Sequence, residues 1–192
     1  PRASGRGRGR RNAFAFDFRG YGRSGGAPQI AQIDRDVRGA AAYLRSRGVR
    51  RLALVGASMG GQALANLLGA RLTTSLGLAC RETVRDPRIR AAVGLVPYMG
   101  QTLLPSFCDD QNGAADLRGP YLAISGTADT TAPIKMVEQA LNRASASRYL
   151  VELPGVGHEY RPDFRGDVMT WTVNFLRAYL GETLEITLDL LA

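Results

Sequence analysis

The sequence predicts an α/β fold, a three-layer sandwich with a mostly parallel sheet, from two observations. Short apolar runs bounded by glycine or proline are typical of buried parallel strands. They alternate along the chain with longer segments in which apolar residues recur every three or four positions, as in amphipathic helices. This alternation predicts a sheet covered by helices on both faces. The 192 residues, 45% of them hydrophobic, are enough for one domain with an ordinary core.

The first elements follow from local pattern. Residues 12–18 alternate aromatic side chains with small or polar ones, which predicts a strand. A glycine-rich loop over residues 19–28 ends in a proline. Residues 29–47 have helical periodicity and precede Gly48, which is a typical helix stop. The apolar residues 51–55 then predict a buried parallel strand.

The middle of the chain continues the alternation. A turn at Ser58 leads into a helix over residues 59–68. Another buried strand is predicted over residues 91–96, and residues 98–118 are predicted to be irregular. Buried strands are also expected at residues 121–125 and, further on, at 148–153.

The last elements complete the predicted sandwich. A helix is expected over residues 133–144, with Pro133 at its first position, where the missing N–H costs nothing. Residues 166–180 predict a final helix, in which Trp171, Phe175 and Tyr179 form a stripe expected in the core. The alternating residues 183–191 predict an added edge strand.

The charge of +8 is unevenly distributed. Residues 1–11 contain five arginines and no acid, and we expect them to be a disordered segment before a single domain over residues 12–192. Such a tail attracts polyanions, but it has no interleaved aromatic residues, so nucleic-acid binding is not expected. The sequence contains no run of eighteen apolar residues, so it does not predict a membrane span. No signal-peptide pattern is visible, and the sequence leaves a cytoplasmic or a secreted location open.

Cys80 and Cys108 bracket the strand predicted at residues 91–96. They permit one disulfide that would tie down the irregular segment after that strand, and they equally permit two free thiols. Together with His158, the single histidine, they have no spacing typical of a zinc site.

Three polar residues follow predicted strands: Ser58, Asp129 and His158. Parallel sheets place ligands at the carboxyl ends of their strands, so we expect these three at one edge. A serine hydroxyl needs a base to become a nucleophile, and His158 is the chain's one imidazole. The imidazole needs an acceptor on its other nitrogen, which we assign to Asp129. The backbone N–H of Met59 is then expected to stabilise an oxyanion.

Structural interpretations of these residues remain open. Ser58 fits a small residue in a tight turn, and His158 fits a solvent-facing loop. Asp129 fits a helix cap, in which case Asp109 or Asp110 is the alternative acid.

Four motifs together resemble the α/β-hydrolase superfamily, over about residues 12–180. They are FDFRGYGRS (16–24), GASMG (56–60), SGTADTTAP (125–133) and GVGHEY (155–160). The resemblance is greatest to the dienelactone-hydrolase-like and small esterase branches, although Ser58 replaces the cysteine of true dienelactone hydrolases. It implies that Ser58 is the nucleophile, His158 the base, Asp129 the acid and the Met59 amide an oxyanion donor. In such a turn, Gly56 and Gly60 are expected to avoid clashes beside the serine.

The resemblance implies a serine hydrolase acting on small-molecule esters through an acyl-enzyme, without metal or cofactor. The resemblance does not distinguish ester cleavage from amide cleavage by the same residues. Family members have about three strands and a helix before the first motif, and the second oxyanion donor follows the third strand. The resemblance therefore leads us to expect an N-terminally truncated domain. Either the strand predicted over residues 12–18 pairs with residues 51–55, or a sheet edge is open and invites homo-oligomers. A catalytically weak module that only binds a ligand or partner is the alternative.

Overall fold

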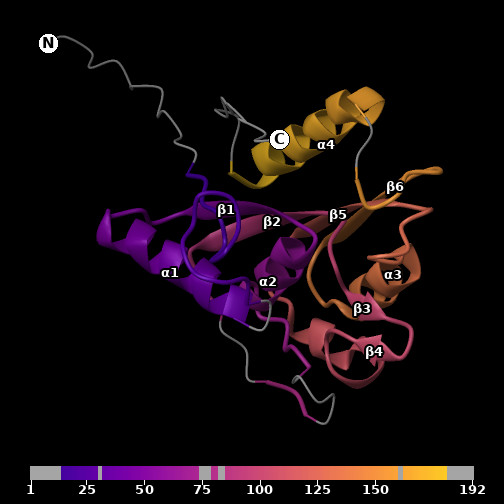
Figure 1. Cartoon of the computed structure of the whole chain (residues 1–192), viewed down its shortest axis with the longest axis horizontal. Coiled ribbons are helices and arrows are strands. Elements are labelled where there is room, and N and C mark those ends of the chain that lie inside the picture. The colour runs from indigo at the N-terminus through magenta and orange to yellow at the C-terminus, as the bar shows by residue number, and fades with distance from the viewer. Residues whose placement is uncertain (1–13, 30–31, 74–78, 82–84, 160–161, 181–192) are drawn as a thin grey trace, which may run out of the picture.

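The computed structural model describes residues 14–29, 32–73, 79–81, 85–159 and 162–180 (Figure 1). The arginine-rich segment predicted over residues 1–11 and the edge strand predicted over 183–191 lie outside these ranges. Within the described ranges, no helix is long and apolar enough to cross a membrane.

A four-stranded parallel sheet forms the centre of the fold (Figure 1). Its order is β1-β2-β5-β6, so each strand lies beside the one that precedes it in this sheet. The strands are β1 (Leu52–Ala57), β2 (Ile89–Leu95), β5 (Tyr121–Gly126) and β6 (Arg148–Leu153). These four predicted strands are confirmed, with bounds that differ from the prediction by no more than two residues. Because all four run the same way, their carboxyl ends share one edge.

Helices cover both faces of the sheet (Figure 1). On one face lie α1 (Ile33–Ser46), α2 (Met59–Leu67) and α3 (Ile134–Arg143), and on the other lies α4 (Arg165–Leu180). Short 3-10 helices span Asp109–Asp116 and Pro162–Phe164. The three-layer sandwich is therefore confirmed.

Alternation along the central strands builds a separate core on each face. Tyr121 and Ala123 of β5 pack with the side of α1, α2 and α3, whereas Leu122 and Ile124 pack with α4. β2 also contributes to both cores, with Ala92 in the first and Ala91 and Val93 in the second. Successive side chains of a strand point to opposite faces, so strands buried on both sides are apolar throughout.

The prediction of a strand over residues 12–18 is wrong for residues 14–18, the part that the structure describes. Residues 14–18 have no strand assignment, and β1 pairs only with β2 among the described strands. The aromatic side chains instead stack on one another and on α1, with ring centroids of Phe14 and Tyr43 5.4 Å apart. The alternation therefore reflects aromatic packing against a helix and not a sheet ladder.

The segment predicted to be irregular over residues 98–118 contains regular structure. A two-stranded antiparallel hairpin, β3 (Gly100–Gln101) and β4 (Leu104–Pro105), follows β2 and precedes the 3-10 helix. We call residues 100–105 the hairpin below.

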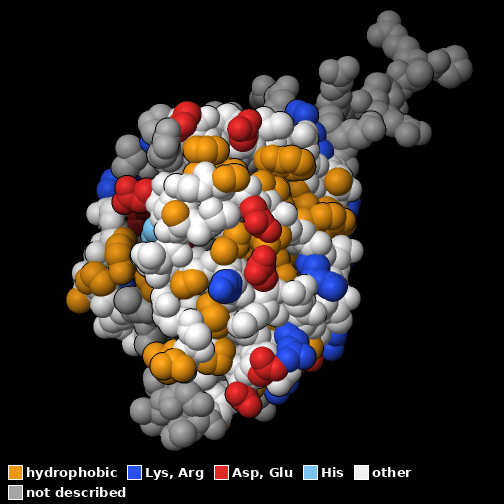
Figure 2. Space-filling view, turned by 90° about the vertical axis from the view of Figure 1, so that its right-hand side faces the viewer, with side chains coloured by type: hydrophobic (Ala, Val, Ile, Leu, Met, Phe, Trp, Pro, Cys, Tyr) orange, Lys and Arg blue, Asp and Glu red, His pale blue; other side chains and the backbone are white. Residues whose placement is uncertain are grey.

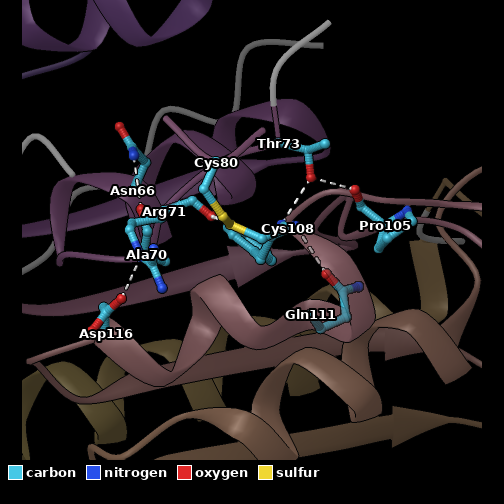
Figure 3. The surroundings of a disulfide bond; sticks show 10 residues. Asn66, Ala70, Arg71, Thr73, Cys80, Pro105, Cys108, Gln111 and Asp116 are labelled. Carbon is cyan, nitrogen blue, oxygen red and sulfur yellow. Dashed lines mark hydrogen bonds and ion pairs between the residues drawn. A yellow bond between two sulfur atoms is a disulfide. The ribbon is translucent and has the colours of Figure 1, made fainter. Parts of the chain in front are cut away.

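A disulfide joins Cys80 to Cys108 and resolves the open choice between bonded and free cysteines (Figure 3). Next to it, the Thr73 hydroxyl donates to the Pro105 carbonyl at 2.7 Å and accepts from the Cys108 N–H at 2.8 Å. The disulfide and Thr73 together fasten the return of the hairpin to the segment that follows α2.

Two smaller predictions are also corrected. Pro133 precedes α3 as its N-cap, with ψ of 129°, and is not its first helical residue. Trp171 is 52% exposed, because it lies on the outer side of α4, while Phe175 and Tyr179 are half-buried. The predicted core stripe is therefore wrong at its first member.

An arginine–aspartate pair joins α1 to the start of β2. The Arg88 guanidinium donates to the Asp86 carboxylate at 2.6 and 3.0 Å, and also to the carbonyls of Ala41 and Val49. The hydrogen bonds from Arg88 hold the pKa of Asp86 below its usual value, against the opposing effect of burial. Asp86 is buried, so its charge depends on this partner.

A tyrosine connects the middle of the sheet to α2. The buried Tyr121 hydroxyl donates to the Gly61 carbonyl at 2.9 Å, passing beside Gly94 of β2. A Cβ at Gly61 would lie 2.6 Å from the Pro97 Cβ, so α2 approaches the end of β2 as closely as glycine allows.

We expect Asp86→Asn to lower the free energy of unfolding by about 2 kcal/mol at pH 7, because Arg88 loses its charged acceptor. A group whose pKa is lowered on folding stabilises above its unfolded pKa and loses this effect as the pH falls. The gap between wild type and variant should therefore close below about pH 4. Urea unfolding at several pH values measures this. A gap independent of pH, or an equal loss in the exposed-site control Asp109→Asn, would contradict it.

We expect Gly61→Ala to lower the free energy of unfolding by about 2 kcal/mol, because the added methyl overlaps Pro97. Gly60→Ala is the matched control. A Cβ there meets only the Phe18 ring, at 3.6 Å, and alanine has the higher helix propensity, so no loss is expected. Far-UV circular dichroism during urea titration compares the two. Equal losses at both positions would show that the contact with Pro97 is not the cause.

Candidate active site

Ser58 lies in the turn between β1 and α2. Its backbone has φ of 49° and ψ of −120°, a conformation that residues other than glycine rarely adopt. Three hydrogen bonds hold its backbone: its N–H donates to the Leu95 carbonyl at 2.9 Å, and its carbonyl accepts from the N–H groups of Tyr98 at 2.9 Å and Gly61 at 3.0 Å. The turn therefore fixes where the serine hydroxyl can point.

The glycines on either side of Ser58 have different roles. A Cβ at Gly56 would lie 2.9 Å from the backbone of Gly60, so the close approach of β1 and α2 requires glycine there. At Gly60 itself a Cβ would make an ordinary contact with Phe18. The expected clash is confirmed at Gly56 and is wrong at Gly60.

Asp129 follows β5, and its carboxylate is fully buried. One oxygen, Oδ1, accepts the N–H groups of Thr131 and Ala132, both at 2.8 Å. The other, Oδ2, lies 2.9 Å from Nδ1 of His158. The helix-cap interpretation is wrong, because Pro133 is the N-cap of α3 and that helix end has no side-chain cap hydrogen bond. Asp129 instead holds the loop before α3 with one oxygen and faces His158 with the other.

The alternative acids lie elsewhere. Asp109 and Asp110 are both exposed, and the carboxylate of Asp110 forms an ion pair with Arg143 of α3. Neither has a hydrogen bond to His158 in the structure, whereas Asp129 does.

His158 lies in the loop after β6, with its side chain 28% exposed. The histidine, pale blue, is visible at the molecular surface in Figure 2. Its Nε2 is 3.0 Å from the Ser58 hydroxyl, and its Nδ1 faces Asp129. With a proton on Nδ1, the ring donates to the carboxylate and accepts from the hydroxyl. Three side chains that are up to 100 residues apart thus form one hydrogen-bonded series.

The loop of His158 must cross the sheet edge to reach Ser58, because three inter-strand spacings of roughly 4.8 Å separate β1 from β6. It does so over the end of β5, where the Val156 carbonyl accepts from the Ala128 N–H at 3.0 Å. A Cβ at Gly126 would overlap that carbonyl, so glycine permits the crossing. Sequence reasoning missed Gly126, because nothing local marks it among the many glycines.

The loop over residues 19–28 is held by contacts with Asp17 and with α1, and it takes no part in the hydrogen-bonded series. Asp17 accepts the N–H of Arg23 at 3.0 Å, and Arg19 forms an ion pair with Asp36 of α1 at 2.5 Å. Hydrogen bonds from Arg19 hold the pKa of Asp36 below its usual value. Through these contacts Asp17 and Arg19 hold the loop.

No group of three or more metal-ligating side chains occurs among the described residues. Met59 begins α2, so its N–H belongs to the first helical turn, whose N–H groups have no acceptor within the helix.

No family model matches the chain. Among curated proteins, it is 28% identical over 161 residues to the uncharacterized protein YfhR of Escherichia coli, which covers 82% of this chain and 57% of YfhR. It is 30% identical over 179 residues to an uncharacterized protein of Mycobacterium tuberculosis, covering 90% of this chain and 60% of that protein. The chain therefore spans about three fifths of the length of these relatives.

Solved structures are similar over most of the chain. The Pyrococcus furiosus esterase superposes with a TM-score of 0.65 at 19% identity, covering 87% of this chain and 70% of that one. A monoacylglycerol lipase of Paleococcus ferrophilus gives a TM-score of 0.64 at 15% identity, covering 86% and 82%. The dienelactone hydrolase of Anabaena variabilis gives 0.58 at 21% identity, covering 78% and 61%. The order of strands and helices and these superpositions together lead to one conclusion: the chain has the α/β-hydrolase fold.

Proposed function

We propose that the protein is a serine hydrolase acting on carboxylic esters of small molecules. The observation that carries the proposal is the contact of His158 with two partners, 3.0 Å to the Ser58 hydroxyl and 2.9 Å to the Asp129 carboxylate. The names of the structural neighbours, an esterase, a lipase and a dienelactone hydrolase, support the same class of reaction.

The proposed reaction has two steps. The Ser58 oxygen attacks the ester carbonyl while Nε2 of His158 takes its proton, and the proton then passes to the departing alcohol. Water next attacks the acyl-enzyme with His158 again as base, and the carboxylic acid leaves. Asp129 keeps the histidine in the required tautomer and stabilises its cation. The Met59 N–H, at the positive end of α2, stabilises the oxyanion in both steps.

The two hydrogen-bond partners of His158 differ in solvent exposure. The fully buried Asp129 carboxylate has its other oxygen occupied by two backbone N–H groups, so its orientation is fixed. The partly exposed imidazole and the Ser58 hydroxyl lie where a substrate can reach them. This arrangement supports an enzyme over the alternative of a module that only binds a ligand.

We expect a fluorophosphonate probe to label the protein on Ser58, and Ser58→Ala to lose both labelling and hydrolysis of p-nitrophenyl acetate. Intact-protein mass spectrometry reads the labelling. Ser46→Ala, which removes an exposed hydroxyl on α1, is the matched control and should be labelled as wild type is. Labelling that persists in Ser58→Ala would refute the proposal. A wild type that is neither labelled nor active would favour the ligand-binding alternative.

We expect Asp129→Asn to lower kcat for p-nitrophenyl acetate by about 10³–10⁴-fold, because the amide no longer fixes the tautomer in which Nε2 accepts from Ser58. The variant keeps an oxygen for the N–H groups of Thr131 and Ala132, so the loop should stay in place. Asp110→Asn tests the alternative acid in the same steady-state assay and should cost less than threefold. A large loss in Asp110→Asn with a small one in Asp129→Asn would reverse the assignment.

A further inference from the structure

The hairpin over residues 100–105 exposes the two most exposed large hydrophobic side chains in the described part of the chain. Leu103 is 89% exposed and its neighbour Leu104 is 68% exposed, whereas the other large hydrophobic residues on the surface are at most 52% exposed. Adjacent exposed leucines form an apolar patch of the kind that contacts a ligand or a partner.

The hairpin begins and ends in rigid, buried structure. At its base Met99 and Phe107 are buried, and the amide of the buried Gln111 bridges them. Its Nε2 donates to the Met99 carbonyl at 2.6 Å, and its Oε1 accepts the Phe107 N–H at 2.9 Å. The disulfide and Thr73 also hold the returning strand of the hairpin (Figure 3).

Hydrogen bonds place the hairpin between the two loops of the candidate active site. On one side, the Tyr98 N–H donates to the carbonyl of Ser58 itself at 2.9 Å, two residues before the hairpin begins. On the other side, the Gln101 side chain donates to the Thr131 carbonyl at 2.9 Å, and the Thr131 N–H donates to Asp129. The exposed leucines therefore belong to a hairpin that is bonded to the acid loop and that begins two residues after the bond to the serine turn.

We propose that Leu103 and Leu104 contact the acyl chain of the substrate, and that the preferred substrates are esters of fatty acids with an extended apolar chain. This inference rests on the proposed function. The acyl group, unlike the alcohol, stays bonded to Ser58 in the acyl-enzyme, so an apolar contact with it acts in both steps. Covering the leucines removes apolar surface from water, which favours long chains over acetate.

The test compares p-nitrophenyl decanoate with p-nitrophenyl acetate, below the aggregation concentration of the decanoate. We expect the ratio of the two kcat/KM values to fall about tenfold in the double variant Leu103→Ser, Leu104→Ser, equivalent to about 1.4 kcal/mol of transition-state stabilisation. The double variant Leu103→Met, Leu104→Met keeps apolar side chains and should restore most of the ratio. Thermal unfolding checks that each variant folds.

Tyr43→Ser is the remote control, because Tyr43 is also exposed but lies on α1, on the opposite side of the molecule from the hairpin in Figure 1. It should keep the wild-type ratio. An unchanged ratio in the serine double variant of an active enzyme would overturn the inference while leaving the proposed function intact.

Two further outcomes are decisive. If wild type hydrolyses neither ester and Ser58 is not labelled, the proposed function fails and this inference fails with it. If the serine double variant keeps the ratio but loses sedimentation with phosphatidylcholine vesicles, the hairpin contacts a lipid surface and the acyl-chain assignment is wrong.

Discussion

The close approach of β1 to α2 is the constraint on which the candidate active site depends. The backbone of Gly60 lies so near Gly56 that no side chain fits at Gly56, and in the turn between them Ser58 has a positive φ. A serine in a relaxed turn would be free to rotate away. Here the backbone bonds to Leu95 and Tyr98 oppose any relaxation of the turn. The position of the hydroxyl is therefore a property of the sheet and of α2.

The other two side chains reach the serine because the sheet is parallel and their loops cross its end. Asp129 leaves β5 next to β6, so the acid and histidine loops start as neighbours. The glycine at position 126 then lets the histidine loop lie across β5, toward β1. The fold thus brings a hydroxyl, an imidazole and a carboxylate together through backbone geometry, and the side chains add only the final hydrogen bonds.

Sequence reasoning predicted the elements whose signal is local. The apolar runs of β2 and β5 and the strand–glycine–serine–helix pattern at Ser58 can each be recognised without knowing their neighbours. The same holds for the order of Ser58, Asp129 and His158, each of which follows a different strand of the parallel sheet, and this is why the structure could be expected to place them at one edge.

What sequence reasoning missed depends on contacts between distant segments. Arg88 bonds to carbonyls about forty residues away, and Gln111 fastens the hairpin from a buried position, so neither has a local signature. The side chains of residues 14–18 alternate between aromatic and smaller or polar, as in a strand. A strand also needs a hydrogen-bonded neighbour, and here the aromatic rings pack on α1 instead.

The position of the single tryptophan decides which optical signal can follow this protein. Trp171 already has half of its surface in water when folded, so its fluorescence emission should shift little when the chain unfolds. The near-ultraviolet dichroism of the buried Tyr121 ring, held rigidly between β2 and α2, should report the loss of tertiary packing far more clearly.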